Sequence, residues 1–192
     1  MVNITETLGK NRCSSCGMCY SVCPKNCIDV IYNKKQGFYY PAVNEKLCIN
    51  CGKCEKACPV LHAETAGRTL HPAFYAVWNR QDEARLRSSS GGVFRVLAED
   101  VLADGGVVYG AAFDVHNRLR HVRAESADAL VPLTGSKYVQ SEIGTAFCQV
   151  RADLKNGRRV LFTGTPCQVA GLYAFLGGDD ANLLTADVLC PG

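Results

Sequence analysis

Residues 73–192 contain short apolar runs that alternate with amphipathic stretches. Three of the runs are rich in β-branched and aromatic side chains, a composition that predicts β-strands at 73–79, 106–114 and 158–164. A fourth run, LLTADVL at 183–189, predicts another core strand near the end of the chain.

Two stretches between these runs have the spacing of an amphipathic helix. Val93, Leu97 and Val101 recur every four residues and predict one helix. The second helix is predicted by Ile143, Phe147, Val150 and Leu154. Strands that alternate with helices predict an α/β domain over residues 73–192, with a sheet that is parallel in part. The histidines of HNRLRH, His116 and His121, are expected at the surface of a turn.

Residues 1–60 have a different pattern, in which two short strand-like runs flank the polar sequence NKKQG. CIDVIY at 27–32 and GFYYPAV at 37–43 predict a β-hairpin, with Gly37 supplying the tight turn. Residues 61–72 are polar, lack a sustained period and end in a proline, so we expect a linker there with solvated histidines. The predicted architecture is a small α+β module at 1–60 followed by the α/β domain.

Composition narrows the classes of protein further. Of the 192 residues 47% are hydrophobic and 20% charged, as in soluble globular proteins. No apolar run approaches the roughly 18 to 20 residues of a membrane span, and the N-terminus lacks the apolar segment of a secretory signal. We therefore expect a cytoplasmic protein with reduced thiols. A net charge of +3 gives no support for nucleic acid or an anionic membrane as partner.

Twelve cysteines are distributed unevenly along the chain, with nine of them between residues 13 and 58. The string CxxCxxCxxxCP occurs at 13–24 and again at 48–59, which indicates an internal duplication. The remaining three cysteines are Cys148, Cys167 and Cys190.

Three cysteines at two-residue intervals with a distant fourth favour 4Fe-4S clusters over the alternatives. Disulfides suit small secreted chains, and structural zinc usually takes separated CxxC pairs. In bacterial ferredoxins the fourth cysteine of each string ligates the other cluster. The predicted ligands are therefore Cys13, Cys16, Cys19 and Cys58 for one cluster, and Cys48, Cys51, Cys54 and Cys23 for the second.

Other residues of this region have supporting roles or open ones. Gly17 and Gly52 follow the second cysteine of each string and would let backbone amides approach the cluster sulfurs. Cys27 is left over, either as a small buried residue or as a redox-active or spare ligand. The sequence assigns no role to Cys148.

Three loops of the α/β domain contain glycine and hydroxyl side chains next to predicted helices. SSSGG at 88–92 precedes the first helix, where its hydroxyls can cap the helix or bind a ligand phosphate, and TGSKYVQS at 134–141 precedes the second. In FTGTPCQVAGL at 162–172, Thr165 is a predicted N-cap, Pro166 the first helical residue and Gly177 the stop. Ligands of open α/β sheets bind at this edge of the strands.

SSSGGVF, GSKYVQS, VLFTGTPCQVAGL and DVLCPG, in this order behind a two-cluster ferredoxin module, resemble the coenzyme F-420 hydrogenase/dehydrogenase beta-subunit family. The resemblance covers essentially the whole chain. It implies an iron-sulfur flavoprotein in which clusters pass electrons to FAD, and FAD exchanges a hydride with a deazaflavin or another small molecule. It also implies that the flavin or substrate cleft is lined by Ser89, Ser90, Gly91, Gly92, Ser136, Lys137, Tyr138, Gln140, Gly164, Thr165 and Pro166.

The chain departs from this family near its end. CPG stands where members usually have a histidine after the cysteine, and the chain stops at Gly192, directly after an expected core strand. We therefore expect the α/β domain to be incomplete. The resemblance further implies that Cys167 and Cys190 are half of a third iron-sulfur site, completed by later cysteines in a full-length chain. The alternative is that each is a small buried residue of the α/β core.

The leading hypothesis is an electron-transfer flavoprotein subunit with a redox partner protein. One alternative is a non-catalytic ferredoxin-type carrier whose α/β part docks a partner and binds no flavin. Another is a fragment without activity. The residues do not identify the electron donor, the acceptor, the catalytic groups or the oligomeric state.

Overall fold

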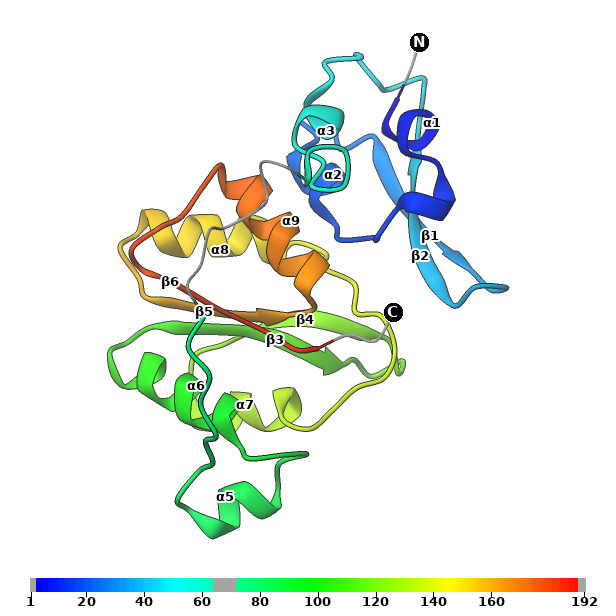
Figure 1. Ribbon diagram of the computed structural model, residues 1–192. Helices are drawn as coiled ribbons and strands as arrows, with labels where there is room; N and C mark the ends of the chain where they lie inside the picture. Colours follow the sequence, from blue (N-terminus) through cyan, green and yellow to red (C-terminus); the bar gives the residue numbers. More distant parts are fainter. Residues whose placement is uncertain (1–2, 64–71, 190–192) are drawn as a thin grey trace.

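The computed structural model describes residues 3–63 and 72–189 and contains two β-sheets (Figure 1). The N-terminal part contains the smaller sheet, which has two strands. Its elements are α1 (Ile4–Leu8), a 3-10 turn (Lys10–Arg12), α2 (Met18–Val22), β1 (Ile28–Asn33), β2 (Phe38–Val43) and α3 (Lys53–Lys56).

Strands β1 and β2 form the predicted hairpin. They pair antiparallel, with Ile28 opposite Val43 and Asn33 opposite Phe38. Gly37 has a φ of 73°, and its amide donates to the Asn33 carbonyl at 2.8 Å. A positive φ at this point costs glycine little, so the turn closes where the sequence places it.

The larger sheet has four strands in the order β4-β3-β5-β6. β3, β5 and β6 are mutually parallel and β4 is antiparallel to β3, which confirms a sheet that is parallel in part. Three of the four predicted strand regions are present. The bounds are Val107–Phe113 for β3, Leu119–Ala124 for β4, Val160–Gly164 for β5 and Leu183–Asp187 for β6.

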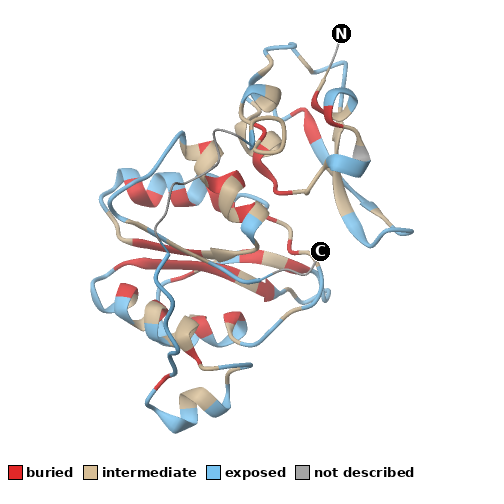
Figure 2. Ribbon diagram, in the orientation of Figure 1, coloured by how far each residue is buried: buried red, intermediate tan, exposed pale blue. Residues whose placement is uncertain are grey.

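Helices cover both faces of this sheet, and their buried sides face it (Figures 1 and 2). Helices α6 (Val93–Ala103) and α7 (Ala127–Leu130, followed by a 3-10 turn at Val131–Leu133) lie on one face, while α8 (Ala146–Lys155) and α9 (Pro166–Leu176) lie on the other. Short helix α5 (Asp82–Leu86) precedes α6. Both predicted long helices are confirmed as α6 and α8. Within the described ranges, no helix has the length and apolar character needed to cross a bilayer.

One hydrophobic core joins the N-terminal part to the larger sheet. α2 contacts α8 and α9, and buried Ile4 and Met18 belong to the same cluster as Phe147 and Leu172. Figure 2 shows buried segments on both sides of this contact. The N-terminal part therefore packs directly against the helical layer formed by α8 and α9.

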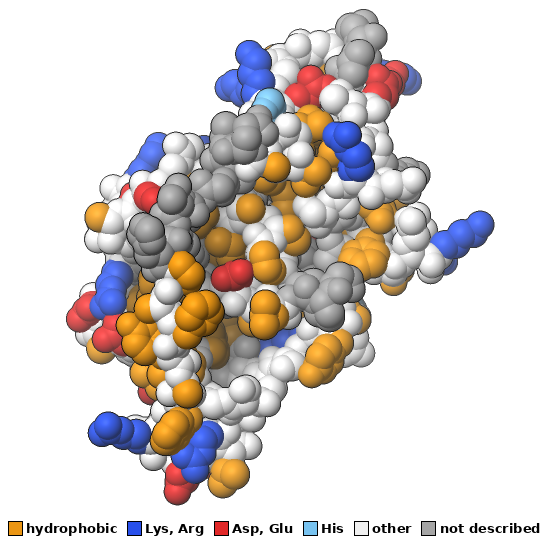
Figure 3. Space-filling model, viewed as in Figure 1, with side chains coloured by type: hydrophobic (Ala, Val, Ile, Leu, Met, Phe, Trp, Pro, Cys, Tyr) orange, Lys and Arg blue, Asp and Glu red, His pale blue; other side chains and the backbone are white. Residues whose placement is uncertain are grey.

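The predicted strand at 73–79 is wrong, because residues 72–79 form no regular secondary structure. The amide of Asn79 donates to the Gly91 carbonyl at 2.6 Å, which ties this segment to the loop before α6. Phe74, Tyr75 and Trp78 are exposed, and Figure 3 shows hydrophobic side chains at the surface along this segment. The aromatic side chains that favour a strand face solvent here, and the segment pairs with no strand of the four-stranded sheet.

The placement of His121 at a surface turn is also wrong. His116 is exposed in the turn between β3 and β4, but His121 lies on β4 and is only 7% exposed. Its Nε2 lies 2.9 Å from the Thr163 carbonyl oxygen, and its ring stacks on Phe162. His121 lies opposite Ala111 in the β3–β4 hairpin, which places it in the core. The arginines on either side of it hide the strand pattern in the sequence.

A largely buried ion pair fastens α8 to β4. The Arg123 guanidinium donates two hydrogen bonds of 2.8 Å to the Asp153 carboxylate, which also accepts from the Tyr109 hydroxyl. The Arg123 contact, together with the tyrosine hydrogen bond, holds the pKa of Asp153 below its usual range. The carboxylate is thus charged and fully partnered at neutral pH.

Candidate iron-sulfur site

The two cysteine strings adopt the same backbone conformation. Ser15 and Asn50 occupy equivalent positions and have left-handed φ values of 54° and 52°. Each uses its amide to donate to the first cysteine of its string, Ser15 to Cys13 Sγ and Asn50 to Cys48 Sγ, both at 3.4 Å. Amide donors stabilise the thiolate form of a ligand and tune a bound cluster. The duplication seen in the sequence is therefore also a structural duplication.

A left-handed glycine ends each loop and starts a short helix. Gly17 has a φ of 86° and precedes α2, and Gly52 has a φ of 68° and precedes α3. A Cβ at Gly17 would lie 2.8 Å from the Tyr20 hydroxyl and 2.9 Å from Ile143. Glycine is needed here both for the backbone conformation and for close packing, a reason beyond the predicted access of amides to sulfur.

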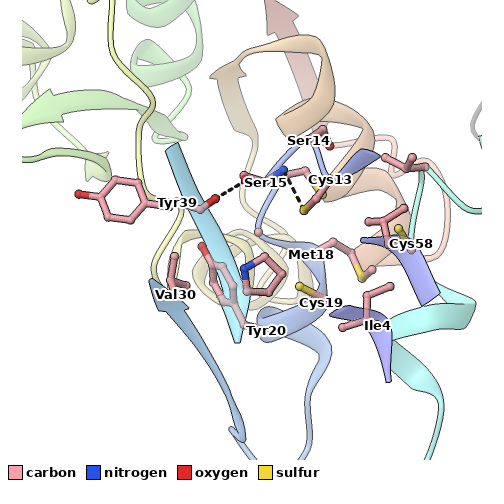
Figure 4. Close-up of a pocket in the computed structure, with 15 residues that line it drawn as sticks. Ile4, Cys13, Ser14, Ser15, Met18, Cys19, Tyr20, Val30, Tyr39 and Cys58 are labelled. Carbon is pink, nitrogen blue, oxygen red and sulfur yellow. Dashed lines mark hydrogen bonds between the residues drawn. The ribbon is translucent and has the colours of Figure 1, made fainter. Parts of the chain in front are cut away.

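Four cysteines of the duplicated strings line a first cavity, shown in Figure 4. Its empty volume, including space open to solvent, is about 440 Å³. Cys13, Cys16 and Cys19 come from the first string and Cys58 from the end of the second. The remaining wall is mostly apolar and includes Ile4, Leu8, Met18, Val30, Pro41 and Val60.

The other four cysteines line a second cavity of about 570 Å³, measured in the same way. Cys48, Cys51 and Cys54 come from the second string and Cys23 from the end of the first. Cys27 lines this cavity as well. The eight thiols are thus divided as crossed ligation requires, because the last cysteine of each string lines the cavity of the other string.

This placement fits clusters in which each cysteine binds a separate iron atom. Thiols spread over the wall of a cavity can each reach one corner of such a cluster, and the apolar lining limits water. In the part of the chain that the structure describes, no group of three or more His, Cys, Asp or Glu side chains could hold one metal ion.

Burial acts on the thiols of both cavities, and it raises the pKa of Cys54 in the second cavity as well. Burial raises the pKa of Cys13 and of Cys19, and raises the pKa of Cys16 to about 11. For Cys23, burial is outweighed by hydrogen bonds from the backbone amides of Cys27 and Lys25, and its pKa is lowered. Thiols with raised pKa values must lose protons to bind iron, so metal binding at either cavity releases protons.

The first cavity is the one next to the larger sheet. A Cβ added at Gly171 of α9 would lie 3.1 Å from both Cβ and Sγ of Cys16. Cys167, the second residue of α9, places its Sγ 3.7 Å from the Ser14 carbonyl oxygen. The loop Cys13–Cys16 therefore rests on the start of α9, while Cys51 of the second cavity is exposed.

Two of the three predicted ligand loops meet. The Ser136 amide donates to Ser89 Oγ at 2.7 Å, which joins the loop before α6 to the loop after the 3-10 turn. Lys137 donates from Nζ to the carbonyls of Thr134 and Gly135 at 2.8 and 3.1 Å. Burial lowers the pKa of this lysine.

Other residues of these loops have roles that the sequence did not indicate. The SSSGG hydroxyls do not cap α6, because Gly92 is the N-cap and no side chain accepts from the helix amides. A Cβ at Gly91 would lie 2.7 Å from the Val77 carbonyl oxygen, so this glycine is required by packing within the chain. Ser90 and Tyr138 are exposed.

Gln140 is directed toward the ferredoxin-type loops. Its Oε1 accepts from the Tyr39 amide at 2.7 Å and its Nε2 donates to the Ser15 carbonyl at 3.3 Å. These bonds link the loop at 134–141 to β2 and to the first cysteine string. The side chain is consequently occupied at the junction of the two parts.

The third loop has the predicted helix start. Thr165 is the N-cap of α9, Pro166 follows it, and Gly177 ends the helix. The Thr165 amide donates to Gln168 Oε1 at 3.0 Å. Gly164, the last residue of β5, accepts from the Val188 amide at 3.0 Å. Cys190, the predicted partner of Cys167, lies outside the described residues.

Comparison with known families matches residues 12–61, about a quarter of the chain, to the 4Fe-4S dicluster domain. A search of curated proteins gave no match to the chain. The N-terminal region is a ferredoxin-type iron-sulfur domain, and its eight clustered cysteines are suited to electron transfer through 4Fe-4S clusters.

Proposed function

We propose that the chain carries electrons through two 4Fe-4S clusters, one in each cysteine-lined cavity. The observation that carries this proposal is the division of eight cysteines into two sets of four. Bound clusters supply one-electron transfer. The first cluster is held by Cys13, Cys16, Cys19 and Cys58, and the second by Cys23, Cys48, Cys51 and Cys54.

Iron and sulfide analysis of anaerobically purified full-length chain tests the number of clusters. We expect about eight iron and about eight sulfide per chain, because each cluster contains four of each. About four iron per chain, or zinc in stoichiometric amount, would contradict the proposal.

The two clusters would act in sequence. Cys51 is exposed beside the second cavity, whereas the first cavity is walled by buried Cys16 and Cys58 and abuts α9. This arrangement supports entry of electrons from a redox partner protein at the second cluster and their exit from the first. The acceptor would then bind at the edge of the sheet where β5 and β6 end (Figure 1).

We further infer a flavin acceptor, so that the chain would be a cytoplasmic oxidoreductase subunit related to the coenzyme F-420 hydrogenase/dehydrogenase beta subunits. Support comes from the resemblance of the three loops and from the contact that joins two of them. FAD would convert single electrons from the clusters into a hydride for a deazaflavin-like or other small molecule. Ser89, Ser136 and Lys137 are the residues that we infer to bind it, as the resemblance implies.

FAD binding by the anaerobic protein tests this inference. Lys137→Ala should weaken FAD affinity roughly tenfold, since a charge-assisted hydrogen bond contributes about 1.5 kcal/mol. Lys35→Ala in the β1–β2 turn is the matched control and should leave the affinity unchanged. Absence of FAD binding by the parent protein, even after reconstitution, would favour the alternative of a ferredoxin-type carrier. That alternative is itself supported by Gln140, which is engaged at the junction between the two parts.

A further inference from the structure

The second cavity contains one more thiol than a cluster needs. Cys27 is 3% exposed, lines this cavity and places its Sγ 3.4 Å from Cys23 Sγ. Its carbonyl accepts from the Asn44 amide at 2.8 Å, which anchors the residue at the start of the β1–β2 hairpin. Cys27 is therefore a fixed, buried thiol directly beside the predicted fourth ligand.

The first cavity has no fifth cysteine in its lining, although Cys167 of α9 lies near it, with its Sγ 3.7 Å from the Ser14 carbonyl oxygen. It is lined by four cysteines, and the position four residues after Cys58 is His62, where the other string has Cys27 four residues after Cys23. The duplicated strings are otherwise alike in spacing and backbone conformation. The chain therefore allows a comparison between a cavity lined by five cysteines and one lined by four.

We propose that Cys27 is a reserve ligand of the second cluster, able to take the fourth position when Cys23 is lost from it. This proposal rests on the proposed binding of two clusters. The 3.4 Å separation of the two sulfurs means that a small movement of Cys27 brings its thiol to the place that Cys23 occupies.

The exchange is balanced without any oxidant or reductant. One iron-thiolate bond to Cys23 breaks and one to Cys27 forms. The proton that Cys27 gives up is taken by the Cys23 thiolate, so neither sulfur changes its oxidation state. Cys27 is more deeply buried than Cys23, which is half-buried at the end of the first string. The reserve thiol is consequently the better shielded of the two.

Iron content and the EPR spectrum of the reduced protein test the proposal. Cys23→Ala, rather than serine, removes any replacement oxygen ligand. We expect this variant to keep about eight iron per chain, with a changed signal for the second cluster. Cys23→Ala combined with Cys27→Ala should fall to about four iron, and Cys27→Ala alone should keep about eight. Cys58→Ala combined with Cys167→Ala is the matched control, which should fall to about four because no further cysteine then lies beside the first cavity.

Two results would overturn the reserve role. One is a Cys23→Ala protein with about four iron, and the other is a protein with about seven iron and a three-iron signal. An unchanged signal from the first cluster in these variants shows that the domain is folded. If the parent chain itself lacks about eight iron, the proposed two-cluster function fails instead, so the two failures are distinguishable.

Discussion

His121 is a neutral residue held inside the protein. It is 7% exposed, and its Nδ1 has no hydrogen-bond partner. Burial lowers its pKa from 6.5 to about 4, against a smaller opposing effect of the Thr163 carbonyl. An imidazolium at this position would be a desolvated charge beside Phe162. Protonation of His121 is therefore unfavourable as long as the ring stays buried.

The free energy of unfolding should therefore decrease at acidic pH because of His121. Its pKa is lower in the folded than in the unfolded protein, so the unfolded state binds more protons below about pH 6.5. The contribution of neutral His121 to the free energy of unfolding is fully present above that pH. It is lost as the pH falls toward 4, by up to about 1.4 kcal/mol per pH unit. Urea unfolding followed by circular dichroism at pH 7 and pH 5.5 measures it.

The variant His121→Gln is the control, because glutamine does not titrate in this range. Its free energy of unfolding should change less between the two pH values than that of the parent chain. Equal changes in the two proteins would show that His121 does not carry the pH dependence.

At the scale of elements, α9 is fitted to the first cysteine loop by a glycine. A Cβ at Gly171 would lie 3.1 Å from Cys16 Sγ and 3.3 Å from the Cys16 carbonyl oxygen. In an exposed helix, alanine would stabilise the protein by up to about 1 kcal/mol relative to glycine. Here the cost of overpacking, about 1 to 3 kcal/mol, opposes that gain.

We expect Gly171→Ala to lower the free energy of unfolding and to alter the EPR signal of the first cluster. The signal of the second cluster serves as the internal control and should stay unchanged, because Gly171 contacts Cys16 of the first cavity. A more stable variant with both signals intact would mean that α9 is not closely packed on this loop.

The sequence predicts those elements whose signals are local. The hairpin needs only its turn glycine, and α6, α8 and α9 are recognised from apolar spacing or from Thr165 and Pro166. The strand predicted at 73–79 is wrong although the composition favours it, because a strand also needs a neighbouring strand to pair with. Strand β4 is not predicted, because Arg120, His121 and Arg123 interrupt its apolar pattern. The pair Arg123–Asp153 is not predicted either, because it depends on the packing of α8 against β4.

The same distinction applies to the candidate site. The cysteine spacings predict the four-and-four grouping because ligand loops are local and duplicated. The sequence does not indicate that Cys27 lies beside Cys23 Sγ, or that Gln140 reaches β2 instead of a ligand. Each of these contacts depends on how separate elements are packed.

For the whole molecule, the main feature is that both parts share one hydrophobic core. Buried residues of α1 and α2 belong to the same cluster as those of β5, α8 and α9. Polar bridges reinforce this junction, since the Gly144 amide donates to the Tyr20 hydroxyl at 3.2 Å. Unfolding of the iron-sulfur region is therefore expected to be coupled to unfolding of the sheet region, with a single cooperative transition.

Gln140 is the residue whose replacement should test this coupling. Its side chain satisfies both the Tyr39 amide and the Ser15 carbonyl across the junction. Gln140→Ala leaves these half-buried groups without their partner, at a cost of about 1 to 3 kcal/mol. Gln140→Glu still accepts from Tyr39 but no longer donates to Ser15, so a smaller loss is expected.

Thermal unfolding of the holoprotein provides the measurement, with cluster absorbance reporting on the iron-sulfur domain and far-ultraviolet circular dichroism on the whole chain. The two curves should coincide in the parent protein. In Gln140→Ala the cluster curve should move to lower temperature and separate from the other, because the junction is weakened while the sheet core is intact. Coincident, unshifted curves in both variants would show that the apolar core alone holds the parts together.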